Sequence, residues 1–243
     1  NDMRAALLHE PPLQSAAQVF RGHLGHCAPP TLPSASGTGR YREALLIVGT
    51  GAAALCRWRA RRLVRNAIMW DRELEPLAEI TKKVYLEVEG DGADAPRGRI
   101  VFGLYAELVP KAAENFRALC TGERQLTYRG SRFHRIFWDF MVQGGEIKTA
   151  DGSGQSIYGS TFEDEESGLD LYHERPGLLG MANSGPDSNS TQFYITTAKA
   201  EWLDGEHVLF GEVLEGREVV LAIEKCATQS GDPSQTIVVT DCG

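Results

Sequence analysis

Hydrophobic and polar residues alternate in short runs over much of the chain after its first third. In one run Val84, Leu86 and Val88 are separated by Tyr, Glu and Glu, and residues 100–104 repeat the pattern with Ile, Phe and Leu. The sequence D-G-A-D-A-P-R-G lies between the two runs. A period of two residues bounded by Gly, Asp and Pro is typical of strands joined by a turn. The pattern therefore predicts two strands here.

Two later stretches carry the same pattern. Thr236–Thr240, T-I-V-V-T, predicts a strand close to the end of the chain. Ser131–Gly145 reads S-R-F-H-R-I-F-W-D-F-M-V-Q-G-G, and its alternation predicts two short strands with a bend near Trp138 and Asp139.

Two segments have helical rather than alternating character. Lys111–Cys120 is entered through Pro110 and followed by Thr121 and Gly122, which are suitable residues for the start and the end of a helix. Residues 216–227 predict a second helix. Many short strands with two helices favour a mainly β fold, a closed antiparallel barrel capped by helices.

The first 76 residues differ from the rest in composition and charge. Residues 1–40 hold clustered prolines and a Ser/Gly/Thr cluster without a sustained period, and alone such a segment is disordered or partly helical. Residues 1–76 contain 10 Arg, no Lys and 6 acidic residues (+4), which leaves 15 basic and 27 acidic residues (−12) for residues 77–243. We predict an extension at 1–76, ordered by a large protein assembly, and one globular domain at 77–243. Because the chain starts at Asn1, we expect processing or a further stretch before it.

The extension includes one apolar run, Ala44–Cys56, for which we predict a short helix over residues 43–58. Its 13 residues carry no charge, whereas a simple membrane span needs about 20. Tyr41 and Trp58 flank the run and several arginines follow it, as at a membrane interface. A helix packed on a partner protein explains the run equally well, so both interpretations stay open.

The overall composition limits the classes of partner. The 243 residues are 42% hydrophobic and 8% aromatic, as in soluble globular proteins. An acidic domain lacks the basic face that nucleic acid requires, so we expect no nucleic-acid partner. The cysteines form no C-x-x-C motif and are odd in number, which favours free thiols in a reducing compartment over disulfides; they are Cys27, Cys56, Cys120, Cys226 and Cys242.

The stretch Ser131–Gly145 also holds candidate chemistry. It places His134, Arg135 and Gln143 among large apolar residues. A guanidinium is costly to bury without a partner, so Arg135 either forms a buried ion pair or awaits a ligand carbonyl. This stretch alone leaves both alternatives open.

Two later motifs favour a ligand-binding role for Arg135, because they resemble those of a known family. They read G-L-L-G-M-A-N-S-G-P-D-S-N-S-T-Q-F-Y-I-T, from Gly177 to Thr196, and E-W-L-D-G-E-H-V-L-F-G, from Glu201 to Gly211. Over about residues 80–243 the chain resembles the cyclophilins, which are peptidyl-prolyl cis-trans isomerases. The resemblance implies an eight-stranded antiparallel barrel with a helix at each end. It also implies proline-containing peptides as substrates and cyclosporin-type ligands, with no metal and no cofactor.

The resemblance assigns roles to individual positions. Arg135 is the donor to the proline nitrogen, and His134, Gln143 and Asn183 complete the catalytic set. Its substrate-binding positions form the walls, back, rim and polar edge of a proline pocket: Phe140, Met141, Ala182, Ser184, Gln192, Phe193, Tyr194, Trp202, Leu203 and His207. Without the resemblance, each of the apolar positions and His207 would be interpreted as core.

The sequence departs from the family pattern at several places. Tyr194 stands where the family usually has Phe, so its hydroxyl needs water or a partner at the pocket edge and is expected to weaken ligand affinity modestly. The bend that usually reads Pro-Gly is Trp138-Asp139, the glycine loop 151–155 is shorter by one residue, and the segment 162–174 is longer by about two. We expect the fold to survive these changes.

Two functions fit the sequence. The first is an active cyclophilin-type isomerase attached to an organellar membrane assembly through residues 1–76. The second keeps the fold without the reaction, as a structural subunit of that assembly. For both we expect an organellar location on the reducing side of the membrane, stromal or matrix, with the plastid thylakoid preferred over the mitochondrial inner membrane.

Overall fold

The computed structural model describes residues 75–92, 94–147 and 155–243. The predicted extension at 1–76, apart from its last two residues, and its helix at 43–58 lie outside these ranges. The glycine loop 151–155 also lies outside them, except for Gln155.

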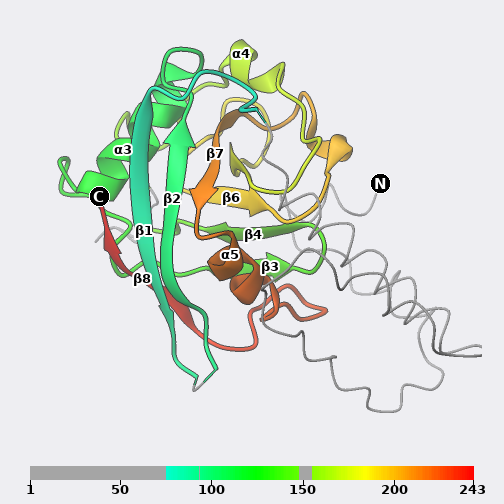
Figure 1. Ribbon diagram of the computed structural model, residues 1–243. Helices are drawn as coiled ribbons and strands as arrows, with labels where there is room; N and C mark the ends of the chain where they lie inside the picture. The colour runs from blue at the N-terminus through cyan, green and yellow to red at the C-terminus, as the bar shows by residue number, and fades with distance from the viewer. Residues whose placement is uncertain (1–74, 93, 148–154) are drawn as a thin grey trace, which may run out of the picture. The chain divides into compact units, whose positions relative to one another are not determined.

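One antiparallel sheet of eight strands dominates the domain. Its order is β3-β4-β6-β5-β7-β2-β1-β8, and the sheet curls around its core in Figure 1. The strands are β1 Lys82–Gly90, β2 Arg97–Leu104, β3 Arg135–Phe137, β4 Met141–Gly144, β5 Leu178–Met181, β6 Phe193–Thr196, β7 Leu209–Glu215 and β8 Ile237–Cys242. The mainly β prediction is confirmed.

The strands β1 and β2 form the hairpin that the alternation predicts. Val84 pairs with Phe102 and Leu86 with Ile100, and all four side chains are buried. The predicted strands at 131–145 are also present, as β3 and β4, with Arg135 opposite Gln143. The period of two residues therefore located these strands because each has one face in the core.

The two ends of the sheet order, β3 and β8, share no continuous ladder. The residues just before β3 do bond to β8: the Phe133 N–H donates to the Ile237 carbonyl at 3.0 Å, and the Val239 N–H donates to the Ser131 carbonyl at 2.9 Å. The structure thus shows a curled sheet with a partly bonded seam. Full closure into a barrel stays a prediction.

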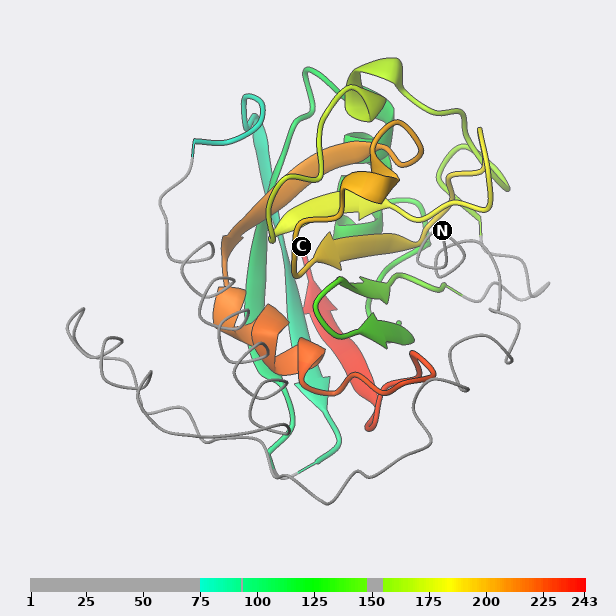
Figure 2. The same ribbon diagram turned by 90° about the vertical axis from the view of Figure 1, so that its right-hand side faces the viewer.

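The described residues contain three α-helices, one more than predicted. The predicted helices are α3 Pro110–Thr121 and α5 Arg217–Glu224, and the additional one is α4 Glu166–Leu169. Helix α3 packs on β1 and β7, whereas α5 packs on β2, β3 and β4 (Figures 1 and 2). Helix α4 was not predicted because four residues are too few to show a helical period.

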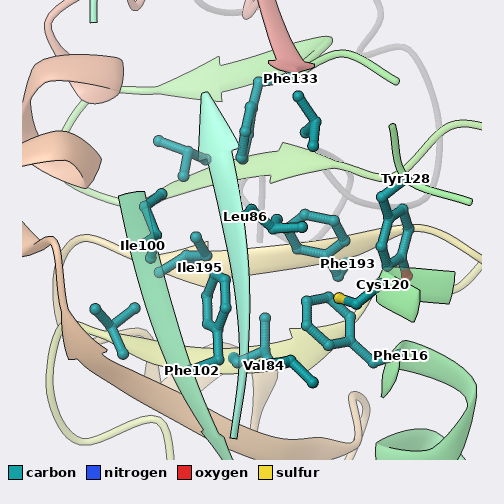
Figure 3. Packing of buried hydrophobic residues seen from close by; sticks show 14 of the residues in the cluster. Val84, Leu86, Ile100, Phe102, Phe116, Cys120, Tyr128, Phe133, Phe193 and Ile195 are labelled. Carbon is teal, nitrogen blue, oxygen red and sulfur yellow. The ribbon is translucent and has the colours of Figure 1, made fainter. Parts of the chain in front are cut away.

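The core lies inside the curl of the sheet. Phe116 on α3 contacts Phe193 on β6 with ring centroids 5.1 Å apart, and Tyr128 contacts both rings. These side chains and the aliphatic residues of β1 and β2 gather in Figure 3. Phe193, expected behind the proline pocket, therefore belongs to the main core.

Candidate active site

One row of side chains crosses four neighbouring strands. Arg135 on β3 lies opposite Gln143 on β4, Gln143 lies opposite Tyr194 on β6, and Tyr194 lies opposite Gly180 on β5. Residues directly opposite each other in an antiparallel ladder share a face of the sheet. The register therefore brings a cation, an amide and an aromatic ring together on one face.

The residues next to this row point to the opposite face. Ile136, Val142 and Ile195 belong to the main core cluster, whereas Met141 and Tyr194 belong to a separate apolar cluster. This division follows the alternation of side chains along a strand. The same three strands thus supply the core on one side and the candidate site on the other.

The separate cluster brings together most of the expected pocket walls. Its buried members are Phe140, Met141, Ala182, Tyr194, Ala200 and Leu203, with Phe137 and Trp202 packed against them. The Trp202 and Phe140 ring centroids are 5.2 Å apart. The expected wall and rim residues from β4, β6 and the 3₁₀ helix Glu201–Leu203 are therefore neighbours in space.

Arg135 is partly buried at the start of β3. The guanidinium carbon lies 5.3 Å from the centroid of the Phe137 ring, two residues along the same strand. A guanidinium over an aromatic face keeps its charge and its donors while one side of the plane is covered. The arrangement suits an arginine that acts on a ligand at the surface of the sheet.

The polar positions around Arg135 are linked to one another. The Gln143 Nε2 donates to the Gln192 Oε1 at 2.7 Å, and the His134 backbone N–H donates to the Gln143 carbonyl at 3.1 Å. Among the described residues the buried Gln143 Oε1 and the His134 Nδ1 have no hydrogen-bond partner. Burial lowers the pKa of His134, so this imidazole is neutral near pH 7.

Asn183 and His207 shape the loop beside the cluster. The Asn183 Nδ2 donates to the Glu206 carbonyl at 2.9 Å, and the His207 Nδ1 lies 3.2 Å from the Met181 carbonyl, to which it donates. Burial lowers the pKa of His207, whose ring meets the Tyr194 ring edge-on at 5.8 Å. His207 is thus a satisfied, buried histidine that also borders the cluster.

The Tyr194 hydroxyl does not lie at the pocket edge. Tyr194 is fully buried, and its Oη is 2.6 Å from the Nε2 of His173, outside the cluster of expected walls. The expected partner therefore exists, but it lies in the interior of the domain. This position removes the reason for which the hydroxyl was expected to weaken ligand binding.

His173 and Asp204 are absent from the residues predicted for the site. His173 Nδ1 lies 2.8 Å from the Asp204 Oδ1, so Tyr194, His173 and Asp204 form one chain of contacts. A tyrosine at a position where the family has phenylalanine was the available signal, because a buried hydroxyl requires a partner. Among the predicted residues, Ser184 lies exposed in the loop after Asn183.

The bend between β3 and β4 is supported from α5. Asp139 has a φ of 57°, in the left-handed region that favours Gly, and its backbone N–H donates to the Glu224 Oε1 at 2.8 Å. Burial raises the pKa of Glu224 to about 7. The sequence Trp138-Asp139 thus keeps the tight bend that precedes Phe140 and Met141.

Two other kinds of site are missing from residues 75–92, 94–147 and 155–243. No group of three or more His, Cys, Asp or Glu side chains in these ranges could hold a metal ion. None of the helices there has the length and apolar character required to cross a membrane.

The described domain is similar to known proteins. The family described as "Cyclophilin type peptidyl-prolyl cis-trans isomerase/CLD" matches residues 85–243. The peptidyl-prolyl cis-trans isomerase CYP21-1 of Arabidopsis thaliana is 51% identical over 174 residues, which covers 68% of this chain and 76% of that protein.

Proposed function

Because this chain belongs to the cyclophilin-type peptidyl-prolyl cis-trans isomerases, we propose that the row of Arg135, Gln143 and Tyr194 is where it isomerises the X-Pro bond. The apolar cluster beside the row receives the proline ring. His134, Asn183 and Gln192 form the polar edge that holds the backbone of the substrate, and His207 completes the wall. Proline-containing peptides are the substrates, and cyclosporin-type ligands compete for the same surface.

The reaction requires electrostatic help rather than a nucleophile. Rotation about the X-Pro bond has a barrier of about 18–20 kcal/mol because amide resonance is lost when the bond twists. In the twisted state the nitrogen lone pair is free to accept a hydrogen bond, so a donor placed there stabilises the transition state more than the planar ground state. Shortening the reaction from tens of seconds to milliseconds takes roughly 10⁴-fold, or about 5.5 kcal/mol. Arg135 supplies this donor.

The observation that carries the proposal is the register of the row. Arg135 and Gln143 are opposite each other on the face that also presents the apolar cluster. Arg135 is half-buried, and its guanidinium lies over the Phe137 ring. A proline ring on the cluster places its nitrogen toward the guanidinium.

The test compares two arginines that each lie over an aromatic ring. Arg135→Ala should lower kcat/KM on a proline tetrapeptide by a factor on the order of 10²–10³, the loss expected for one transition-state donor. Arg99→Ala is the matched control, because the Arg99 guanidinium lies 4.0 Å from the centroid of the Tyr85 ring on the β1–β2 hairpin. Equal rates for Arg135→Ala and the parent would refute the role of Arg135 and favour the alternative, a structural subunit with little or no activity.

We further propose that residues 1–76 attach this domain to a large protein assembly at an organellar membrane. The change of net charge at the domain boundary and the apolar run Ala44–Cys56 support this proposal. We prefer the reducing side of the thylakoid over the mitochondrial inner membrane as the location of the domain.

Two experiments test the attachment. Residues 77–243 alone should be soluble and folded, and an insoluble product would reject the division into two parts. Carbonate extraction of membranes then separates the two modes of attachment, because a spanning segment keeps the full chain in the pellet, whereas a helix docked on protein releases it.

A further inference from the structure

The Tyr194 hydroxyl is the inner end of a chain of polar groups that runs through His173 to Asp204. His173 Nε2 lies 2.6 Å from the Tyr194 Oη, and His173 Nδ1 lies 2.8 Å from the Asp204 Oδ1. The His173 backbone N–H also donates to the Asp204 Oδ1 at 2.7 Å, and the Ala200 N–H donates to the His173 carbonyl at 2.9 Å. His173 and Tyr194 are fully buried. Each polar group of His173 is therefore hydrogen bonded to Tyr194, Ala200 or Asp204.

The partners fix the direction of each hydrogen bond. A carboxylate only accepts, so the His173 Nδ1 carries the proton that it donates to Asp204, and its Nε2 accepts from the Tyr194 hydroxyl. Burial lowers the pKa of His173 to about 4, which keeps the ring neutral near pH 7. Burial also raises the pKa of Tyr194 well above its usual value, so the hydroxyl keeps its proton.

This chain connects two separate parts of the site. Tyr194 lies in the row with Gln143 and Arg135 on the sheet. Asp204 directly follows the 3₁₀ helix that carries Trp202 and Leu203, and His207 comes three residues later. His173 is bonded to both, so it sets the distance between the floor of the cluster and its outer wall.

Gly180 makes room for the hydroxyl. A Cβ at this position would lie 2.3 Å from the Tyr194 Oη and 2.4 Å from its Cζ. Both distances are too short for a buried ring that is held in place by His173. The glycine and the tyrosine are thus a matched pair in this sequence.

We propose that His173 and Asp204 are positioning residues for prolyl isomerisation, acting through Tyr194, and that Gly180 and Tyr194 together set the depth of the proline pocket. The inference rests on the proposed function of the row. The chain of bonds touches the wall that receives the proline ring and not the guanidinium of Arg135. Its loss should therefore raise KM and weaken cyclosporin-type ligands while kcat changes little.

The test is a double-mutant cycle in the full-length protein, with KM, kcat and the Kd of cyclosporin A measured for each variant. Tyr194→Phe should raise KM about fivefold, the effect of one lost hydrogen bond to a buried partner. Gly180→Ala should raise KM more than tenfold, roughly the cost of an overpacked core position. In the Tyr194→Phe background the same Gly180→Ala change should cost less, because a ring released from His173 can move away from the new methyl group.

Tyr105→Phe is the matched control. Tyr105 is also a fully buried tyrosine whose hydroxyl is hydrogen bonded, in its case to Glu212 at 2.9 Å. It should lower stability and leave KM unchanged. Additive effects in the cycle, or an equal rise of KM for Tyr105→Phe and Tyr194→Phe, would overturn the positioning role. Equal kcat/KM for Arg135→Ala and the parent would instead overturn the proposed function, so the two failures are distinguishable.

A spectroscopic measurement keeps the proposal testable even if Gly180→Ala does not fold. Long-range ¹H–¹⁵N spectra of the parent protein should show His173 with the proton on Nδ1 at pH 7. In Asp204→Asn, whose side chain can donate as well as accept, this tautomer should lose its preference. A proton on Nε2 in the parent would contradict the proposed chain.

Discussion

Two polar networks include residues that are only two positions apart, His173 and Arg175. The first is a chain of hydrogen bonds through a neutral imidazole, and the second is an ion pair. His173 connects the Tyr194 hydroxyl with the Asp204 carboxylate beside the candidate site. Arg175 forms an ion pair with Glu212, with Nη2 and Oε2 2.6 Å apart, and donates to the Glu75 carbonyl at 2.9 Å, where the described domain begins. One network lies behind the separate apolar cluster, and the other holds Glu75, the first residue that the structure describes.

The difference indicates what each network contributes. A buried ion pair gains little over a well-packed apolar replacement, but removal of one partner leaves an uncompensated charge. The Arg175 pair should therefore affect stability rather than catalysis. The His173 chain touches the cluster that we propose as the site for the proline ring, so its loss should appear in KM.

The largest expected effect comes from breaking the ion pair. Arg175→Met leaves the Glu212 carboxylate and the Tyr105 hydroxyl buried without the cation, which should lower the free energy of unfolding by about 3–5 kcal/mol. Urea denaturation measures the loss. Arg129→Met is the control, since the exposed pair of Arg129 and Asp241 should contribute at most about 1 kcal/mol.

A second variant removes both charges of the Arg175–Glu212 ion pair. Arg175→Met combined with Glu212→Leu should recover most of the lost stability, because no charge is then left buried. At temperatures where the variants are folded, kcat/KM should equal that of the parent. A raised KM in the double variant would mean that the two networks are not separate.

The next effect concerns pH. Burial raises the pKa of Glu224 from 4.5 to about 7, so the folded state holds a proton that the unfolded state releases. The contribution of Glu224 to the free energy of unfolding is fully present below pH 4.5 and is lost as the pH rises through 7. The loss amounts to at most about 3 kcal/mol. Glu224→Gln should remove this decline in the free energy of unfolding.

His173 changes the free energy of unfolding with pH in the opposite direction to Glu224, and it therefore serves as an internal control. Its pKa falls from 6.5 to about 4 on burial, so its stability is present above pH 6.5 and is lost as the pH falls through 4. In Glu224→Gln the loss on the acidic side should persist. A parent and a Glu224→Gln variant with parallel stability curves between pH 4.5 and 7 would show that Glu224 ionises normally.

A smaller effect is expected where a carboxylate meets only backbone groups. The two oxygens of Glu165 accept from the Lys111 and Ala112 N–H groups at 2.9 Å each, at the start of α3. Glu165→Ala should cost about 1–2 kcal/mol, as for other lost helix caps. Glu166→Ala is the matched neighbour, being exposed on α4, and a loss of similar size there would assign the effect to the local segment instead.

Sequence reasoning succeeded where the signal was local or belonged to a long motif. The alternation at β1 and β2 and the boundaries of α3 follow from residues within a few positions of one another. The motifs from Gly177 to Gly211 brought Phe140, Met141, Tyr194 and Leu203 into one predicted pocket, and the structure gathers them in one cluster.

The remaining features depend on pairs that are distant in the sequence. His173 and Asp204 are 31 residues apart, and Arg175 and Glu212 are 37 apart. No periodicity relates such residues, so their burial and pairing become visible only in the folded domain. Gly180 likewise looks like an ordinary strand glycine until the Tyr194 hydroxyl is seen beside it.

We assign ligand binding to the row on β3, β4 and β6 and only a stabilising role to the Arg175 network. Mapping the contacts of a ligand on the protein tests this assignment most directly. The ¹⁵N-labelled full-length chain would be titrated with a proline-containing tetrapeptide, and amide shifts would be followed by NMR. The backbone amides of Arg135, Gln143 and Trp202 should shift and broaden with catalysed exchange, while those of Tyr105, Arg175 and Glu212 stay in place. Shifts centred on Tyr105 and Glu212, with the row on β3, β4 and β6 unaffected, would contradict the assignment of the site.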